Sequence, residues 1–363
     1  MQSDTMPPLI NLFDYEQAAQ TKLPESVFGF YAGGAADEIT LRENRAVFNR
    51  IKLRPRVLTN VSQRALETTL LGHATAMPII IAPMGMAKLA HPDGEVAIAQ
   101  AAKNADIIQC LSTLSNTSLE EVAAVGASCW FQLYVYKDRN ITQRLVERAT
   151  SAGYKAIVLT VDVPVGSLRE NFMRAGLQLP TGLALRNFDE FYNTEAANIR
   201  AFINSQLDPS LTWHDLEWLI SITPLPVLVK GILRGDDAKR AIDCGVSGII
   251  VSNHGGRQLD TAVTGLEALP EVVAAVGMGT EVFVDGGIRR GTDIVKALAL
   301  GARAILVGRP VLWGLAVAGQ DGVEQILAIL RRELDTAMAL CGCASLGDIG
   351  FDLVTRELAG STR

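Results

Sequence analysis

Residues 231–252 read GILRGDDAKRAIDCGVSGIIVS, and residues 287–308 read GIRRGTDIVKALALGARAILVG. The two stretches align without a gap at a constant offset of 56 residues, the difference between 287 and 231. Each begins at the glycine that ends one strand, continues as a helix with an acidic residue near its start, and turns through a glycine into an apolar strand. A repeat of this kind predicts βα units, whose right-handed crossovers place successive strands in one parallel sheet.

The same alternation runs through most of the chain. Eight apolar runs of strand length are separated, for the most part, by helix-like stretches. They lie at residues 78–82, 107–111, 130–135, 156–161, 226–229, 248–251, 281–284 and 304–307. Eight such units favour an α/β fold of the closed (β/α)8 TIM-barrel type. The alternative is an open doubly wound sheet, although no GxGxxG fingerprint follows an early strand.

Two segments fall outside this alternation. Residues 1–75 predict an N-terminal helical segment, with helices at 15–23, 24–34 and 37–50. Residues 166–211 show no clear βα pattern, so we expect a lid-like insertion after the fourth strand, mobile and placed over the active site. Together these parts predict a single domain that spans residues 1–363.

The composition describes a globular protein with ample core, because 48% of its 363 residues are hydrophobic and 20% are charged. The formal net charge of −6 argues against nucleic acid or an anionic membrane as the main partner. The five cysteines show no metal-site spacing, so no metal is expected. The N-terminus lacks a signal-peptide pattern and no apolar segment is long enough to span a bilayer, so we expect a cytoplasmic protein.

The clearest candidate for chemistry is the stretch IIVSNHGGRQLD at residues 249–260. A buried strand ends here in Ser252 and is followed by His254, two glycines and Arg257. A single histidine is more often structural than catalytic. Two adjacent glycines, however, let the backbone approach a ligand, and Arg257 places a fixed positive charge beside a titratable imidazole. The stretch therefore predicts a base and an anion-binding cation at one strand end.

In a (β/α)8 barrel the active site forms at the carboxyl ends of the strands. The residues at or just beyond the other strand ends are Pro83, Met84, Gly85, Ser112, Leu114, Gln132, Tyr134, Thr160, Asp162, Arg169, Lys230, Asp285, Gly286, Gly287, Arg289, Gly308 and Arg309. The last two units have glycine turns beside arginines, and barrels often bind phosphate after strands seven and eight. We therefore expect a phosphate-bearing cofactor; the alternative is that these glycines only make tight turns.

The stretch SNHGGRQ at residues 252–258 matches without a gap the SNHG(A/G)RQ motif of the FMN-dependent α-hydroxy-acid oxidase and dehydrogenase family, which the chain resembles as far as Gly342. Other matching stretches are KLPESVFGFYAGGAADEITL, LRPRVL, FQLYVYKDR, LTVDVP, LVKGI, VDGGIRRGTD and VGRP. The resemblance implies bound FMN and oxidation of an L-2-hydroxy acid, L-lactate or a similar small acid, to the 2-oxo acid. It implies O2 as the electron acceptor, giving H2O2, or another acceptor, and a homotetramer or octamer.

Position by position, the resemblance assigns residues to the cofactor. Those expected at the flavin ring are Pro83, Met84, Gly85, Ser112, Gln132, Thr160 and Lys230. Among them, Lys230 would lie near N1 and the C2 carbonyl and stabilise negative charge on the reduced flavin. Those expected along the ribityl chain and at the phosphate are Ser252, Asp285, Gly286, Gly287, Arg289, Gly308 and Arg309.

The resemblance also assigns the substrate contacts and the catalytic roles. Arg169 and Arg257 would anchor the substrate carboxylate, because guanidinium groups make charge-assisted bonds that can be bidentate. His254 would act as the base and take a proton, held by Asp162, which favours the protonated imidazole. Tyr134 would bond the substrate hydroxyl.

Four positions depart from the plant-type pattern of the family. Phe30 replaces the first tyrosine of a Tyr-Tyr pair, Met84 a threonine, Leu114 a tryptophan, and Gly166-Ser167 a Leu-Gly pair. Phe30, Met84 and Leu114 are expected to contact the substrate. Since Gly166 opens space and Met84 takes it, the alternative substrates are bulkier ones, hydroxymandelate-like or peptide-derived. A weakly active flavin-binding homologue is a further alternative.

Overall fold

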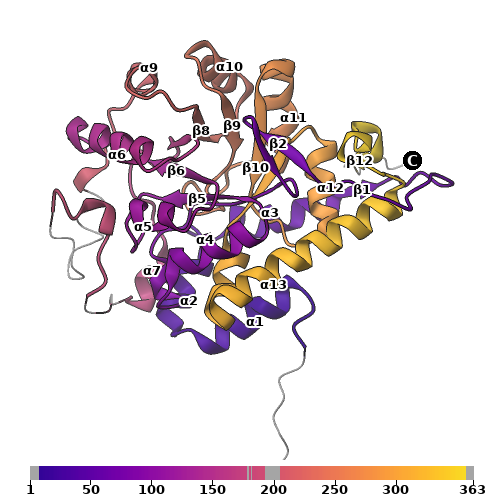
Figure 1. The fold of residues 1–363 in the computed structure, drawn as a ribbon, viewed down its shortest axis with the longest axis horizontal. Helices are drawn as coiled ribbons and strands as arrows, with labels where there is room; N and C mark the ends of the chain where they lie inside the picture. Colours follow the sequence, from indigo (N-terminus) through magenta and orange to yellow (C-terminus); the bar gives the residue numbers. More distant parts are fainter. Residues whose placement is uncertain (1–7, 178–179, 181, 193–204, 357–363) are drawn as a thin grey trace, which may run out of the picture.

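The computed structural model describes residues 8–177, 180, 182–192 and 205–356. At its centre, eight parallel strands close into a barrel in the order β10-β11-β4-β5-β6-β7-β8-β9 (Figure 1). The strands are β4 (Ile79–Ile81), β5 (Ile108–Ser112), β6 (Cys129–Leu133), β7 (Ile157–Thr160), β8 (Val227–Ile232), β9 (Gly248–Val251), β10 (Glu281–Asp285) and β11 (Ala304–Val307). The predicted (β/α)8 TIM barrel is confirmed, and each strand overlaps its predicted run.

The barrel strands are buried on both faces. One cluster of buried side chains fills the barrel interior and includes Ile80, Trp130, Leu228 and Phe283, while alternate residues face the surrounding helices. Burial on both sides explains why these strands appear in the sequence as continuous apolar runs. The antiparallel hairpin of β2 (Thr68–Leu70) and β3 (His73–Thr75) adds Leu70 to the interior cluster and covers the end where the strands begin.

A helix follows every barrel strand and packs outside it (Figure 1). These helices are α4 (Gly94–Asn104), α5 (Leu119–Ala124), α6 (Arg139–Ser151), α9 (Trp213–Ser221), α10 (Gly235–Asp243), α11 (Gly265–Val276), α12 (Gly291–Ala299) and α13 (Arg309–Cys341). Capping boxes at Ser118 and Thr264 begin α5 and α11. Since each helix returns the chain to the start of the next strand, all eight strand ends meet on one side of the barrel.

The predicted N-terminal helical segment is present as α1 (Leu12–Lys22), α2 (Glu25–Ala32) and α3 (Ile39–Arg50), and α1 lies beside α13 (Figure 1). The Asp260 carboxylate accepts hydrogen bonds from the backbone N–H groups that begin α3, at 3.2 and 2.8 Å. Asn44 of α3 exchanges two buried amide hydrogen bonds with Asn253, at 2.9 and 2.8 Å. The N-terminal segment is thereby attached to the loop after β9 that carries His254.

The remaining strands join the N-terminal segment to the end of the described chain. Strand β1 (Ile51–Leu53) pairs antiparallel with β12 (Val354–Arg356), outside the barrel. No local pattern in the sequence predicts this pairing, because β1 and β12 lie about 300 positions apart and each is only three residues long.

The insertion at residues 166–211 contains a short helix, α7 (Glu170–Ala175), and a single turn, η2 (Arg186–Phe188). The buried Asn187 side chain donates hydrogen bonds to Thr113 O at 2.9 Å and Ser115 Oγ at 3.0 Å, and accepts one from Leu119 N at 2.8 Å. This part of the insertion is therefore fixed to the loop after β5. Residues 178, 179, 181 and 193–204 lie outside the described residues, so the mobility expected of the insertion stays a prediction.

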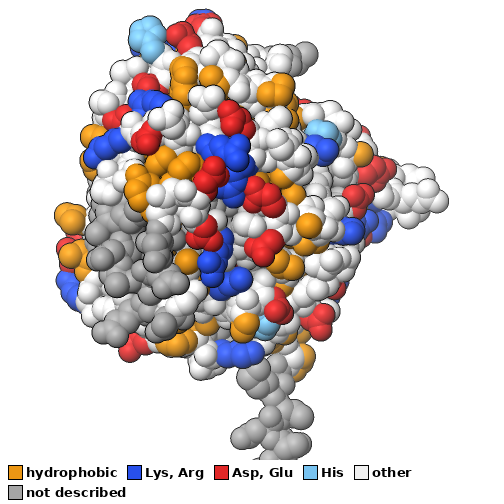
Figure 2. Space-filling model, turned by 60° about the vertical axis from the view of Figure 1, so that its left-hand side comes forward, with side chains coloured by type: hydrophobic (Ala, Val, Ile, Leu, Met, Phe, Trp, Pro, Cys, Tyr) orange, Lys and Arg blue, Asp and Glu red, His pale blue; other side chains and the backbone are white. Residues whose placement is uncertain are grey.

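Charged side chains of both signs lie next to one another on the face shown in Figure 2. Surface ion pairs include Arg148 with Glu120 at 2.7 Å and Arg144 with Glu190 at 2.9 Å. Exposed pairs contribute at most about 1 kcal/mol each, so the buried core carries the stability of the fold. Within the described part of the chain, no helix is both long enough and apolar enough to cross a membrane.

Candidate active site

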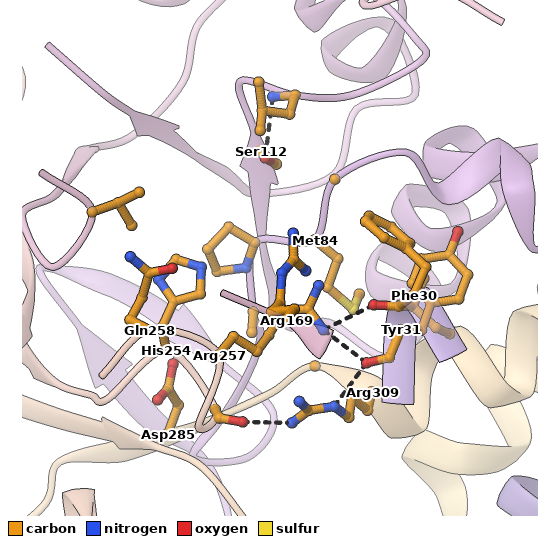
Figure 3. Close-up of a pocket in the computed structure, with 18 of the residues that line it drawn as sticks. Phe30, Tyr31, Met84, Ser112, Arg169, His254, Arg257, Gln258, Asp285 and Arg309 are labelled. Carbon is orange, nitrogen blue, oxygen red and sulfur yellow. Dashed lines mark hydrogen bonds between the residues drawn. The ribbon is translucent and has the colours of Figure 1, made fainter. Parts of the chain in front are cut away.

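A cavity of about 620 Å³ opens at the carboxyl ends of the barrel strands (Figure 3). Its volume lies in the range typical of cofactor and substrate sites. The residues predicted for the site all line this cavity, with the exception of Asp162 and Ser252. Residues far apart in the sequence, from Phe30 to Arg309, are thus brought together as the barrel geometry requires.

His254 lies in the loop after β9, in a left-handed backbone conformation with φ of 59°. Its Nδ1 is 2.9 Å from Asp162 Oδ1, beyond the end of β7, and its backbone N–H donates to Ser252 Oγ at 3.0 Å. Burial alone would raise the pKa of Asp162, but the His254 imidazole and the Lys230 ammonium outweigh burial and lower it. Asp162 is therefore an ionised partner behind the cavity wall that orients the imidazole.

Gly231, which the sequence analysis treated only as a strand end, makes room for this pair. Its φ is +113°, and a Cβ at this position would lie 2.7 Å from the Cβ of Asp162. A side chain here would displace the carboxylate that holds His254. A glycine inside a strand often marks a close approach of another part of the chain, as in LVKGI, but its partner could not be inferred from the sequence.

Lys230 reaches the base of the cavity from β8. Its Nζ donates to Ser252 Oγ at 2.8 Å and lies 3.1 Å from Asp285 Oδ2. Burial disfavours the charged ammonium, yet the neighbouring carboxylates of Asp285 and Asp162 hold the pKa of Lys230 above its usual value. Ser252 is fully buried and supports Lys230 and His254 through its hydroxyl, and its predicted place on the ribityl path stays a prediction.

A chain of buried polar side chains crosses β5, β6 and β7, the three strands next to β8. Ser112 Oγ donates to Gln132 Oε1 at 3.2 Å, and Gln132 Nε2 donates to Thr160 Oγ1 at 3.0 Å. Beyond β6, burial and the nearby Asp162 charge raise the pKa of Tyr134, so its hydroxyl stays protonated near neutral pH. The wall can therefore offer both donors and acceptors to a heterocyclic ring, and Tyr134 can donate a hydrogen bond.

Arg257 and Arg309 both bind the carboxyl end of α2 (Figure 3). Arg257 Nη1 lies 3.0 Å from the carbonyl oxygens of Phe30, Tyr31 and Gly33. Burial and the charges of Arg169 and Arg309 lower the pKa of Arg257. A helix carries partial negative charge at its carboxyl end, which stabilises these buried guanidinium groups.

Arg309 was predicted at the phosphate, and its guanidinium has backbone acceptors in this structure. Nε donates to Tyr31 O at 2.9 Å, Nη1 to Gly255 O at 3.0 Å and Nη2 to Gly33 O at 3.2 Å. Burial and the Arg289 charge lower the pKa of Arg309 to about 10. Its observed contacts are those of a structural cation, and a phosphate contact stays a prediction.

Two of the predicted glycines, Gly287 and Gly308, are glycines for different structural reasons. A Cβ on Gly287, where φ is +77°, would lie 1.8 Å from the Asn44 carbonyl oxygen, so packing against α3 excludes any side chain. At Gly308 a Cβ would meet its nearest atom, Ala82 Cβ, at 3.7 Å, which is ordinary contact. Protein packing explains Gly287, whereas Gly308 leaves space on the cavity side for a ligand to approach the backbone.

Three further residues near the site were not predicted. The buried Tyr31 hydroxyl donates to Met86 O at 2.6 Å and joins α2 to the loop after β4. The carboxylate of Glu95, 1% exposed, accepts hydrogen bonds from the loops that carry Met84 and Leu114. Gln258 lines the cavity and donates to the Asp162 carbonyl at 2.9 Å. Gln258 stands in the SNHGGRQ motif, but nothing near Tyr31 or Glu95 in the sequence points to these distant partners.

A family model described as FMN-dependent dehydrogenase matches residues 19–356. The chain belongs to the FMN-dependent dehydrogenase family. This member is 56% identical over 351 residues to an L-lactate oxidase of Nostoc sp., covering 94% of this chain and 96% of the relative. It is 49% identical over 347 residues to glycolate oxidase 3 of Arabidopsis thaliana, covering 94% of each chain.

Solved structures of the family have the same fold. The structure of mandelate oxidase with (S)-4-hydroxymandelic acid superposes with a TM-score of 0.91 at 46% sequence identity, covering 96% of this chain and 99% of that one. Another structure of mandelate oxidase, with (S)-2-phenylpropionate, gives a TM-score of 0.89 at 46% identity. The family resemblance noted from the motifs is confirmed, and it covers almost the whole chain.

FMN is the cofactor of this family, and the cavity has residues that fit it. Asp285 Oδ1 is buried and has no hydrogen-bond partner within the described residues, so it can accept from a polyol. Arg289 is buried, with a pKa lowered by burial, and its recorded carboxylate contact, Glu16 Oε2, is 3.8 Å away. A phosphate beside Arg289 and the open backbone at Gly308 would supply the charge that this buried guanidinium lacks.

Proposed function

We propose that this flavoprotein oxidises a small L-2-hydroxy acid to the 2-oxo acid, with L-lactate as the first candidate and O2 as the acceptor that gives H2O2. The observation that carries the proposal is that His254, 2.9 Å from Asp162, faces the same cavity as Arg169 and Arg257. A base beside two guanidinium groups suits a substrate with a carboxylate next to a hydroxyl. The oxidase names of the relatives support the same chemistry.

In this proposal the two arginines bind the substrate carboxylate and Tyr134 donates to its hydroxyl. Arg257 is held from behind by three backbone carbonyls, so its guanidinium is already oriented before substrate arrives. Preorganised donors of this kind lose little conformational entropy on binding. Arg169 approaches from the insertion and completes the pair.

His254 takes the proton that the substrate loses. Because Nδ1 faces Asp162, the nitrogen available to the substrate is Nε2. The ionised Asp162 stabilises the imidazolium that forms, and the hydrogen bond from the His254 backbone to Ser252 keeps the ring in place. Because Asp162 and Ser252 hold His254 in place, His254 can act as a general base, which must lie within hydrogen-bond distance of the proton that it takes.

When bound, FMN supplies the two-electron acceptor for the reaction. We assign the ring contacts to the Ser112–Gln132–Thr160 chain, to Lys230, and to the backbone of the residues predicted after β4. We assign the ribityl chain to Asp285 and the phosphate to Arg289 with the glycines that follow β10 and β11. The paired Lys230 ammonium would stabilise negative charge that develops on the ring.

A second candidate is a bulkier hydroxy acid of the hydroxymandelate type. One observation favours it: apolar side chains line the outer cavity, namely Phe30, Leu168, Phe172, Met173 and Leu177. The Phe30 and Phe172 rings are 5.2 Å apart, so an aromatic substituent could pack beside them.

The test is anaerobic mixing of the purified holoenzyme with L-lactate, glycolate and (S)-mandelate while the visible absorbance of the flavin is followed. We expect fast bleaching with L-lactate, and faster bleaching with (S)-mandelate if the second candidate is correct. Readmission of O2 should restore the colour and produce H2O2. A flavin that none of the three acids reduces would contradict the proposal.

We also propose that residues 1–363 form one domain, that the protein is cytoplasmic and that it assembles as a homotetramer. The attachment of α3 to the loop after β9, through Asn44 and Asn253, supports the single domain. Light scattering of the holoenzyme measures the assembly, and localisation of the tagged protein in its own cells measures the compartment.

A further inference from the structure

The phenyl ring of Phe30 lies beside two cations of the cavity. Phe30 is in the last turn of α2 and is 8% exposed. The guanidinium carbon of Arg257 is 5.5 Å from the centre of this ring, and that of Arg169 is 5.6 Å from it. Figure 3 shows the side chains of Arg169 and Arg257 beside Phe30, with His254 on the far side of the arginines.

Two partly buried guanidinium groups so close together repel one another. Burial and the charge of Arg169 both act against the cationic form of Arg257. The face of an aromatic ring carries partial negative charge, and a cation placed over it within about 6 Å is attracted. A ring shared by both cations therefore offsets part of their repulsion and limits the positions that each can take.

Phe172 provides an internal comparison. Its ring centre is 5.1 Å from the guanidinium carbon of Arg169 and 5.2 Å from the ring centre of Phe30. One phenyl ring thus contacts both arginines, and the next contacts Arg169.

We propose that Phe30 is a positioning residue for carboxylate recognition, which acts by holding the guanidinium groups of Arg169 and Arg257 next to its ring so that both address one carboxylate. The inference rests on the proposed function, since it takes a 2-hydroxy acid as the ligand. Phe30 gives the ligand no hydrogen bond of its own. Its contribution therefore depends on the charge of the ligand and on the presence of the arginines.

The experiment is a set of double-mutant cycles read by binding of pyruvate, the product expected from L-lactate. Pyruvate affinity is measured by calorimetry on the oxidised holoenzyme, so no turnover is needed. The single variants are Phe30→Leu, Phe172→Leu, Arg169→Met and Arg257→Met, and each phenylalanine variant is combined with each arginine variant. Coupling in such a cycle isolates the interaction between the two side chains.

We expect Phe30→Leu to weaken pyruvate binding about tenfold, and to weaken it less than threefold once Arg169 or Arg257 has been removed. Phe172→Leu should couple to Arg169, because its ring centre lies 5.1 Å from that guanidinium carbon. Phe30→Tyr, which keeps the ring, should retain wild-type affinity within about threefold or improve it. Pyruvamide, the neutral analogue, should bind wild type and Phe30→Leu equally, because it has no carboxylate for the arginines to bind. A general loss of structure would instead weaken the binding of both ligands.

Additive effects of Phe30→Leu with both arginine variants would overturn the inference, as would an equal loss of pyruvate and pyruvamide affinity. In either case a wild-type protein that binds pyruvate and is reduced by L-lactate keeps the proposed function. A wild-type holoenzyme that binds no pyruvate and is reduced by no hydroxy acid would overturn both. Retention of FMN and an unchanged melting temperature in Phe30→Tyr show that the position tolerates substitution.

Discussion

The two sides of the cavity are built from different parts of the chain and by different contacts (Figure 3). On one side, His254, Asp162 and Lys230 come from the ends of β9, β7 and β8, and their polar contacts are 2.8–3.1 Å long. On the other side, Phe30 and Arg169 come from α2 and the insertion, and they meet through a ring and a cation 5.6 Å apart.

This difference separates two tasks. Proton transfer needs a base placed at hydrogen-bond distance, which rigid barrel strands provide. Recognition of a substrate needs a surface that can vary between relatives, which loops and added helices provide. We therefore expect substitutions on the strand side to change the rate of reduction, and substitutions on the α2 side to change affinity.

The largest effect is expected from removal of the base. His254→Ala should retain FMN and slow reduction of the flavin by L-lactate about 10²- to 10⁴-fold, the range for loss of a general base. The control is His214→Ala, because His214 is exposed on α9 and does not line the cavity. Reduction of the His254→Ala protein at the wild-type rate would show that His254 is not the general base.

Substitution of either arginine should weaken carboxylate binding to a similar extent, but only the substitution of Arg257 should destabilise the protein. Arg169→Met and Arg257→Met should each weaken carboxylate binding about 10- to 100-fold, as expected for a lost hydrogen bond to a charged group. Arg257→Met should also lower the melting temperature, because it leaves the carbonyl oxygens of Phe30, Tyr31 and Gly33 without this donor. Equal melting temperatures for the two variants would show that Arg257 does not hold α2.

A smaller effect is expected from Gly231→Ala, which should push the Asp162 carboxylate away from His254 and slow reduction about tenfold. The matched control is Gly245→Ala, because Gly245 has a similar φ of +97° but no atom within 4 Å of a built Cβ. Both variants should lose about 1 kcal/mol of stability to backbone strain. If both slow the reaction equally, the strain and not the Asp162 contact is responsible.

The smallest effect concerns pH. The pKa of Asp162 is lowered in the folded protein, so its ionisation stabilises the fold above the usual value of about 3.9, and this stability is lost as the pH falls through the lower folded pKa. Asp162→Asn should therefore make the free energy of unfolding less dependent on pH in this acidic range. Denaturant unfolding at several acidic pH values measures it, and identical slopes for both proteins would contradict the ionised role.

Much of this strand side could be predicted from the sequence. The barrel strands are buried on both faces, so they appear as apolar runs, and their ends mark the cavity. Lys230 directly follows such a run, and His254 follows one after two residues. The hydrogen bonds that Ser252 makes with Lys230 and His254 could not be inferred, because they join side chains from two different strand ends.

The rest depends on contacts that leave no local pattern. Helix α7 was not predicted, since six residues are too few to show helical periodicity. Asn187 lies in a stretch that reads as turns, yet it is buried against the loop after β5. The shared ring contact of Phe30 joins α2, the insertion and the loop after β9, three segments that only the folded chain brings together.

The division between the two sides is tested most directly by one anaerobic stopped-flow series, in which the rate of flavin reduction is measured over a range of L-lactate concentrations. The series yields a limiting rate and an apparent dissociation constant for the same protein. We predict that His254→Ala lowers the limiting rate at least 100-fold with little change in the dissociation constant. We predict that Phe30→Leu raises the dissociation constant about tenfold with little change in the limiting rate. If both variants change the same parameter, the two sides of the cavity do not have separate tasks.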